Sequence, residues 1–139
     1  MMFDTKKIHA QNKLNHVMVH KTVKHYFDSL NQPVHANFVT DFFCEESYIR
    51  FEHQERAGRA AILELLQSNQ LNRIQSLTDL SIDIPSLDLV ALVHGHVMIE
   101  TENHLTEPYT FTMTLVSDRL VCDRYNNQWL IHRLNYQPM

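Results

Sequence analysis

The chain has 139 residues, of which 44% are hydrophobic, and this is enough apolar material for the core of one domain. A formal net charge of -4 argues against nucleic acid or an anionic membrane as a partner. With only 2 cysteines and 2 glycines, we expect neither a disulfide framework nor a glycine-rich phosphate loop. The N-terminus does not resemble a signal peptide and no segment is long enough to cross a membrane, so we expect a cytoplasmic protein, and we predict no cofactor.

The first part of the chain has helical periodicity. We expect a single domain over residues 1–139, in which the polar residues 1–10 form a loose N-terminal extension. From about Asn12 to Asn31, apolar residues recur at steps of three and four, as in an amphipathic helix. Pro33 ends this helix because the residue before a proline avoids the helical region, and Pro33 also suits the first turn of a second, short helix.

The rest of the chain changes from helical to strand periodicity. Ser47 to His53 alternates as a strand does, residues 54–58 form a predicted turn, and Ala60 to Leu66 form a predicted third helix. Four further strands are expected at Ile74–Ile84, Leu87–Thr101, Tyr109 to about Tyr125 with a bend near Ser117-Asp118, and Gln128–Tyr136. Asn126-Asn127 suits a tight hairpin turn. Helices followed by antiparallel strands predict an α+β fold.

Several short motifs follow one another in a fixed order. They are HYFDSLN at the end of the first helix, FFCEES, SYIRFE, GRAAI at residues 58–62, VHGHV at residues 93–97, and Trp129, Ile131 and Arg133 near the end. Together they resemble the nuclear transport factor 2-like superfamily, also called SnoaL-like or ketosteroid-isomerase-like, over about Val19 to Tyr136. The resemblance implies a cystatin-like cone, with three N-terminal helices packed into a strongly curved, mixed and mostly antiparallel sheet around an apolar pocket.

The resemblance leaves two classes of function open, because this fold serves many of them. Our leading hypothesis is a small-molecule-binding protein of the SnoaL-like type for an apolar or cyclic compound, with dehydratase, isomerase or cyclase chemistry. The alternative is a non-catalytic protein-binding module of the nuclear transport factor type, in which Phe51 and Glu52 form the aromatic–glutamate pair of that branch.

Residue-by-residue comparison with the isomerase branch gives one match and two departures. Tyr26 matches the tyrosine that donates a hydrogen bond to the substrate oxygen. A purely structural tyrosine in the core is an equally good interpretation of this position. The position of the aspartate base is Phe51, and the second acid corresponds to Thr110. Because phenylalanine cannot take up a proton, the resemblance disfavours steroid-type isomerisation.

The predicted ligand-binding residues of the pocket are Phe51, Thr110, Thr112, Trp129 and Arg133. In a regular strand Arg133 shares a face with Trp129, so its guanidinium would face the pocket mouth and could hold a carboxylate. The alternative for Arg133 is a salt bridge at the sheet rim with Asp118 or Asp123.

The histidines of the VHGHV motif raise a third hypothesis, a metal site at His94, His96 and Glu100. The apolar face of this strand is the other one, so we predict outward-facing histidines and no bound metal. The resemblance implies that this outer sheet face, with Leu92, His94, His96, Met98, His132 and Tyr136, forms a homodimer interface. With histidines there, we expect the dimer to weaken below about pH 6.

Overall fold

The computed structural model describes residues 5–68, 74–85, 89–100, 105–121 and 128–139. The helices are α1 (Thr5–Ser29), α2 (Ala36–Phe42), α3 (Arg59–Gln67) and the short α4 (Asp118–Val121). The strands are β1 (Phe43–Phe51), β2 (Gln54–Ala57), β3 (Ile74–Asp83), β4 (Val90–Glu100), β5 (Thr106–Ser117) and β6 (Trp129–Pro138).

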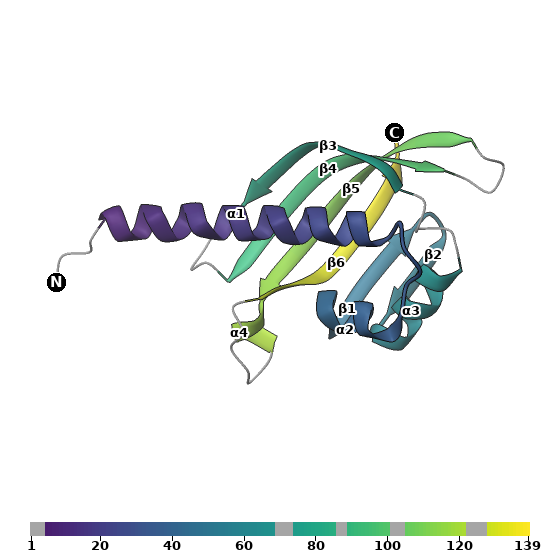
Figure 1. Cartoon of the computed structure of the whole chain (residues 1–139), viewed down its shortest axis with the longest axis horizontal. Coiled ribbons are helices and arrows are strands. Elements are labelled where there is room, and N and C mark those ends of the chain that lie inside the picture. The colour runs from purple at the N-terminus through teal and green to yellow at the C-terminus, as the bar shows by residue number, and fades with distance from the viewer. Residues whose placement is uncertain (1–4, 69–73, 86–88, 101–104, 122–127) are drawn as a thin grey trace.

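The six strands form one mixed sheet in the order β2-β1-β6-β5-β4-β3. The neighbouring strands β1 and β6 are parallel, and every other neighbouring pair is antiparallel. In Figure 1, α1 crosses one face of the sheet, and α2 and α3 lie at the end that holds β1 and β2. The predicted α+β architecture, with helices packed on a mixed and mostly antiparallel sheet, is confirmed.

Helix α1 begins at Thr5, which is earlier than the predicted start near Asn12, so residues 5–10 are helical rather than loose. Its buried stripe repeats at three- and four-residue steps, as the sequence predicts. The stripe consists of Val19, Val23, Tyr26, Phe27 and Leu30. The N-terminal part of α1 projects past the edge of the sheet (Figure 1). The C-terminal half of the helix is therefore the part that builds the core.

Two neighbouring strands carry insertions at the same level of the sheet. In β1 the pairing with β6 shifts between Phe43 and Tyr48, and in β6 the pairing with β5 skips His132. Ser47 holds the β1 irregularity, because its buried Oγ accepts a hydrogen bond from the Cys44 backbone N–H at 2.9 Å and donates one to the Ile131 carbonyl. Such insertions bend a strand and change which face its following side chains occupy.

Each of the two glycines occupies a position where the structure favours a residue without a side chain. Gly58 precedes α3 with φ of 89°, a conformation that other residues rarely adopt. Gly95 lies under the Phe111 ring, where a Cβ atom would come within 2.6 Å of a ring carbon. The G-R-A-A-I and V-x-G-x-V motifs thus mark a tight helix start and a close packing point between β4 and β5.

Two short elements differ from the sequence prediction. Residues 54–58 were expected as a turn, but Gln54–Ala57 pair with β1 as strand β2. The strand predicted to reach Tyr125 ends at Ser117, and α4 follows. The predicted hairpin turn at Asn126-Asn127 lies outside the described residues.

Candidate functional site

Tyr26 lies at the centre of the apolar interior. Its side chain is fully buried, and four phenylalanine rings surround it with centroid distances of 5.2 to 5.6 Å. These rings belong to Phe27 of α1, Phe38 and Phe42 of α2, and Phe43 of β1. The sequence therefore predicted the burial of Tyr26 correctly, and α2 and β1 supply most of its surroundings.

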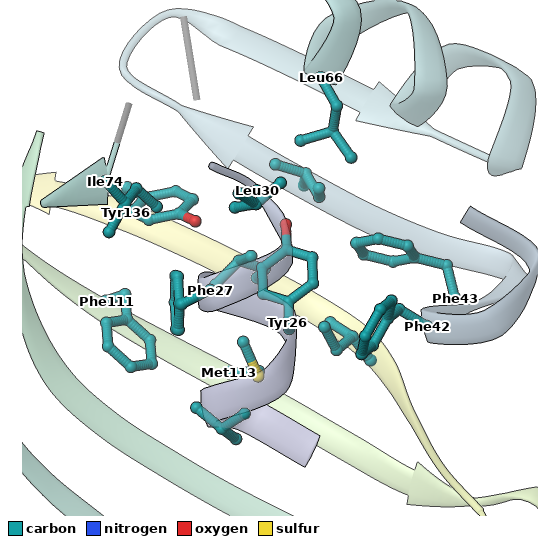
Figure 2. Close-up of a cluster of buried hydrophobic side chains, with 14 of the residues drawn as sticks. Tyr26, Phe27, Leu30, Phe42, Phe43, Leu66, Ile74, Phe111, Met113 and Tyr136 are labelled. Atoms are coloured by element: carbon teal, nitrogen blue, oxygen red, sulfur yellow. The ribbon is translucent and has the colours of Figure 1, made fainter. Parts of the chain in front are cut away.

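Tyr136 of β6 joins Tyr26 from the opposite side. The prediction that Tyr136 lies on the outer sheet face is wrong, because the extra residue at His132 reverses the alternation of the strand. As a result Ile131, Leu134 and Tyr136 are buried and Arg133 is exposed. Figure 2 shows both tyrosine hydroxyls directed into one cluster, from α1 and from β6.

Neither hydroxyl has a hydrogen-bond partner among the described residues. Burial raises the pKa of Tyr26, and the Tyr136 hydroxyl offsets part of that rise. Burial first, and then the nearby Tyr26 hydroxyl, raise the pKa of Tyr136 well above its usual range. The two phenols are therefore neutral and face each other: their hydroxyls do not meet the geometry of a hydrogen bond, yet they are close enough that an interaction of that kind contributes to the pKa of both.

A pair of this kind is a hydrogen-bond donor site. A buried hydroxyl without a partner costs about 1–3 kcal/mol relative to one that is hydrogen-bonded. In an apolar interior, two O–H donors can both serve one oxygen atom, and this arrangement stabilises a carbonyl or a developing oxyanion. The chemistry available at the pair is thus recognition and polarisation of an oxygen.

Phe51 occupies the position that holds the base in the isomerase branch. It is buried, and its ring packs against Tyr109 at 5.3 Å and against Tyr136 at 5.7 Å. The next residue, Glu52, is exposed and accepts a hydrogen bond from the Tyr109 hydroxyl at 2.6 Å. On the same strand, Arg50 forms an ion pair with Glu55 of β2 at 3.8 Å.

Tyr109 differs from the central pair because its hydroxyl is engaged. Besides Glu52, the Glu107 carboxylate lies 3.4 Å from it. Burial, followed by the effects of Glu52 and Glu107, raises the pKa of Tyr109. This end of the interior therefore has carboxylates at its rim, while the centre near Tyr26 has neutral hydroxyls.

The predicted pocket residues of the last strands divide between the two faces of the sheet. Thr110 is half-buried and Thr112 is exposed, while their neighbours Phe111 and Met113 point into the core. The expectation that Arg133 shares the inner face of Ile131 is wrong because of the insertion at His132. Thr112 and Arg133 both line a hollow of about 540 Å³ on the sheet face turned away from α1, called the outer hollow below.

Trp129 remains on the inner side, at a second hollow. This space of about 530 Å³ lies between α1, α2 and the start of β6, and its apolar part is formed by Met18 and by the buried Phe42 and Trp129. Its polar lining comes from Lys21, Thr22, His25, Asp41 and Gln128. Trp129 is thus separated from Thr112 and Arg133, with which the sequence had grouped it.

A third hollow, called the α1–β3 groove below, was not predicted. Its volume is about 300 Å³, and its apolar lining consists of Phe27, Ile74, Leu77 and Leu80. The Phe27 ring borders this groove and also contacts the Tyr26 ring at 5.2 Å and the Phe111 ring at 4.9 Å. Phe27 therefore stands between the groove and the tyrosine pair. Its place on the buried stripe of α1 was the only signal available in the sequence.

The histidines of β4 face outward, as predicted. His94 is exposed, and His96 lies 3.0 Å from the Asp79 carboxylate, at the irregular part of β3. Across the part of the chain that the structure describes, no three His, Cys, Asp or Glu side chains are grouped as they would be around a metal ion. His96 thus has a carboxylate partner that the metal hypothesis did not include.

None of the described helices combines the length and the apolar character needed to span a membrane.

Comparison with known proteins identifies the fold. No family model and no curated protein matches the chain. Among solved structures, an NTF2-like protein with a cystatin-like fold from Novosphingobium aromaticivorans matches with a TM-score of 0.72 and 13% identity, covering 100% of this chain and 92% of that one. At such identity the likeness establishes the fold alone.

Two further structures carry names of enzymes. A candidate scytalone dehydratase from Novosphingobium aromaticivorans matches with a TM-score of 0.70 and 16% identity, over 92% of this chain and 86% of that one. A candidate ketosteroid isomerase from Shewanella frigidimarina matches with a TM-score of 0.64 and 11% identity, over 84% and 92%. The expected likeness to the nuclear transport factor 2-like and ketosteroid-isomerase-like group is confirmed for the fold.

Proposed function

Starting from the cystatin-like fold that this chain shares with NTF2-like proteins, we propose that the protein binds a small apolar or cyclic molecule through an oxygen atom of that molecule. Tyr26 and Tyr136 act as the two hydrogen-bond donors. The observation that carries this proposal is the pair of fully buried hydroxyls without a partner among the described residues. A ligand oxygen would satisfy both, and the surrounding phenylalanines would bury the rest of the ligand.

The α1–β3 groove is the proposed entrance through which a ligand reaches the tyrosine pair. It has an apolar floor, and Phe27 separates it from the tyrosine pair by the thickness of one ring. A ligand in the groove would reach the Tyr26 hydroxyl by displacing the Phe27 ring, which is buried against the rings of Tyr26 and Phe111. The polar residues at its rim, among them Lys24 and Asp28, remain in contact with water.

The proposal also addresses whether the protein catalyses a reaction on the bound molecule. The dehydratase and isomerase names among structures of this fold fit a site that polarises a ligand oxygen. Dehydration, isomerisation or cyclisation also requires a proton acceptor, and the position of the isomerase base is Phe51. We therefore propose ligand binding as the function, and polarisation of the bound oxygen as the contribution of the two tyrosines.

The test compares two bicyclic probes that differ in one oxygen atom, 1-tetralone and the hydrocarbon tetralin. Thermal unfolding is followed with each probe, on the natural protein and on the double variant Tyr26→Phe/Tyr136→Phe. The proposal expects a rise in Tm with 1-tetralone for the natural protein only. Equal shifts with both probes, or an equal shift in the double variant, would show that the hydroxyl pair does not recognise the oxygen.

The protein-binding alternative receives less support. Glu52 is exposed at the rim, as a docking residue should be, but Phe51 is 7% exposed and packs between two tyrosines. An aromatic anchor at this position is unavailable to a partner. Only the glutamate half of the pair could take part in docking.

We also propose that two copies associate in the cytoplasm through the outer face of β4. Leu92 and His94 are exposed there, and His96 and Met98 are half-buried in the single chain. Sedimentation analysis at pH 7.5 tests this, with a dimer as the expected result. A monomer at micromolar concentration would contradict it.

A further inference from the structure

The outer hollow combines several hydrogen-bond donors from three neighbouring strands. It lies over β1, β5 and β6, and its volume is about 540 Å³. Its donors are the guanidinium groups of Arg50 and Arg133, the hydroxyls of Tyr48, Thr112 and Thr114, and the amide of Asn135. The parallel pairing of β1 with β6 begins with Tyr48 beside Arg133 and ends with Phe51 beside Tyr136. This register places the donors of both strands on the same face of the sheet.

Arg133 is the charged group of this hollow that has no carboxylate partner. None of the described acidic side chains forms an ion pair with it, and its guanidinium carbon lies 5.8 Å from the centre of the Tyr48 ring. A guanidinium held over an aromatic ring is partly oriented but keeps its hydrogen-bonding edge available. Arg133 is exposed, so this edge is open to a ligand.

Arg50 adds a second positive charge that is only weakly neutralised. Its ion pair with Glu55 is 3.8 Å long, and both side chains are more than half exposed, so the pair contributes little. Burial first, and then a hydrogen bond to Glu55, raise the pKa of Tyr48, while the nearby charges of Arg50 and Arg133 lower it by smaller amounts. Both guanidinium groups therefore act on the space around one tyrosine hydroxyl.

Among the described residues, the acidic one in the lining of the outer hollow is Glu46, which is exposed, and Glu55 lies beside it next to Arg50 and Tyr48. The lining therefore contains two guanidinium groups and one carboxylate, together with neutral groups that offer hydroxyl and amide hydrogens. Arginine forks bind carboxylate and phosphate oxygens through two parallel hydrogen bonds. Threonine and asparagine side chains suit hydroxyl groups of the same molecule.

We propose that the outer hollow is a second binding site, for a small polar organic molecule that bears an oxyanion. Arg133 and Arg50 hold the oxyanion, and Thr112, Thr114 and Asn135 bind hydroxyl groups of the ligand. This site is independent of the tyrosine pair, because the sheet separates the outer hollow from the interior.

The experiment uses the natural 139-residue chain and three probes of similar size, gluconate, glucose 6-phosphate and glucose. Chemical shifts of backbone amides are followed by two-dimensional NMR during titration. Saturable shifts confined to β1, β5 and β6 are expected with one or both of the anions and not with glucose. The anion that binds distinguishes a carboxylate from a phosphate ligand.

Three variants locate the site. Arg133→Gln and Arg50→Gln should each weaken binding by about 10- to 100-fold, as expected for lost hydrogen bonds to a charged group. Arg56→Gln is the matched control, because Arg56 lies on β2 next to the site but not in its lining. The same spectra report whether each variant is folded.

Three results would overturn the proposal, and the first two concern the anions. One is the absence of saturable shifts with both anions, and the other is binding that Arg133→Gln leaves unchanged. Binding of glucose as strong as that of the anions would also contradict it, since the two guanidinium groups would then have no role.

Discussion

Two regions of the interior bury hydroxyl groups in opposite ways. At the irregularity of β1, the Ser47 hydroxyl is fully buried and joins Cys44 to the Ile131 carbonyl. In the centre of the core, the hydroxyls of Tyr26 and Tyr136 are buried as deeply but have no partner among the described residues. A buried hydroxyl therefore stabilises the backbone at Ser47, whereas the buried hydroxyls of Tyr26 and Tyr136 remain available for another hydrogen-bond partner.

The difference separates a structural role from a functional one. A satisfied buried hydroxyl stabilises the fold, and its removal leaves backbone groups without partners. An unsatisfied buried hydroxyl lowers stability, so its presence requires another explanation, and a ligand oxygen is the one that we propose. Substitutions in the two regions should consequently have effects of opposite sign.

The largest effect is expected for Ser47→Ala. The Cys44 N–H and the Ile131 carbonyl would each lose a buried hydrogen bond, so the free energy of unfolding should fall by about 2–4 kcal/mol. Urea unfolding measures this. Ser68→Ala is the control, because the Ser68 hydroxyl also bonds a carbonyl, that of Leu65, at an exposed position. Equal effects of the two substitutions would contradict the role of Ser47.

The second effect depends on pH. The pKa values of Tyr26 and Tyr136 are raised in the folded state, so above about pH 10 the unfolded chain loses protons that the folded chain retains. Below pH 10 these two groups should therefore not change the free energy of unfolding. Above pH 10 each of the two tyrosines should lower it by about 1.4 kcal/mol per pH unit. Unfolding curves between pH 9 and pH 11 measure the slope.

The two regions should differ clearly in that experiment. Tyr26→Phe and Tyr136→Phe should each make the slope above pH 10 shallower, whereas Ser47→Ala should leave it unchanged. An unchanged slope in both tyrosine variants would mean that the central hydroxyls ionise as freely in the folded chain as in the unfolded one.

A smaller loss is expected for Tyr109→Phe. This hydroxyl donates to the Glu52 carboxylate at 2.6 Å, so its removal should lower stability by about 1 kcal/mol. Tyr109→Phe is the matched comparison for the central pair, because the same atom is removed from a tyrosine that has a partner. A gain in stability would contradict the hydrogen bond with Glu52.

The smallest effect has the opposite sign. Tyr26→Phe and Tyr136→Phe each remove an unsatisfied hydroxyl and keep the ring, so stability should stay the same or rise by up to about 1 kcal/mol. For a chain of this length, 1 kcal/mol corresponds to about 2–4 °C in Tm. A loss of more than 1 kcal/mol would show that the hydroxyls have a partner in the free protein.

Regular periodicity predicted the main elements well. The buried stripe of α1 and the alternation of β4, where His94 and His96 face outward, follow from side-chain geometry alone. Gly58 and Gly95 also mark positions that favour glycine, the first because of its positive φ and the second because of the Phe111 ring above it. The fold class could therefore be predicted over most of the chain.

The candidate site was harder to predict from the sequence, because its composition depends on one inserted residue. The extra residue at His132 places Tyr136 inside and Arg133 outside, which is the reverse of what uninterrupted alternation predicts. Tyr26 was found because the helix is regular at that point, while its partner Tyr136 was missed. Bulges leave little trace in a single sequence, since their hydrogen bonds come from distant residues such as Ser47.

The central claim is that the Tyr26 and Tyr136 hydroxyls are available for a ligand oxygen. The most direct test is urea unfolding of the natural protein and of Tyr26→Phe/Tyr136→Phe, each with and without saturating 1-tetralone. Without the probe, the double variant should be at least as stable as the natural protein. With the probe at a hundred times its Kd, only the natural protein should gain, by about 2.7 kcal/mol. A less stable double variant, or an equal gain in both proteins, would contradict the claim.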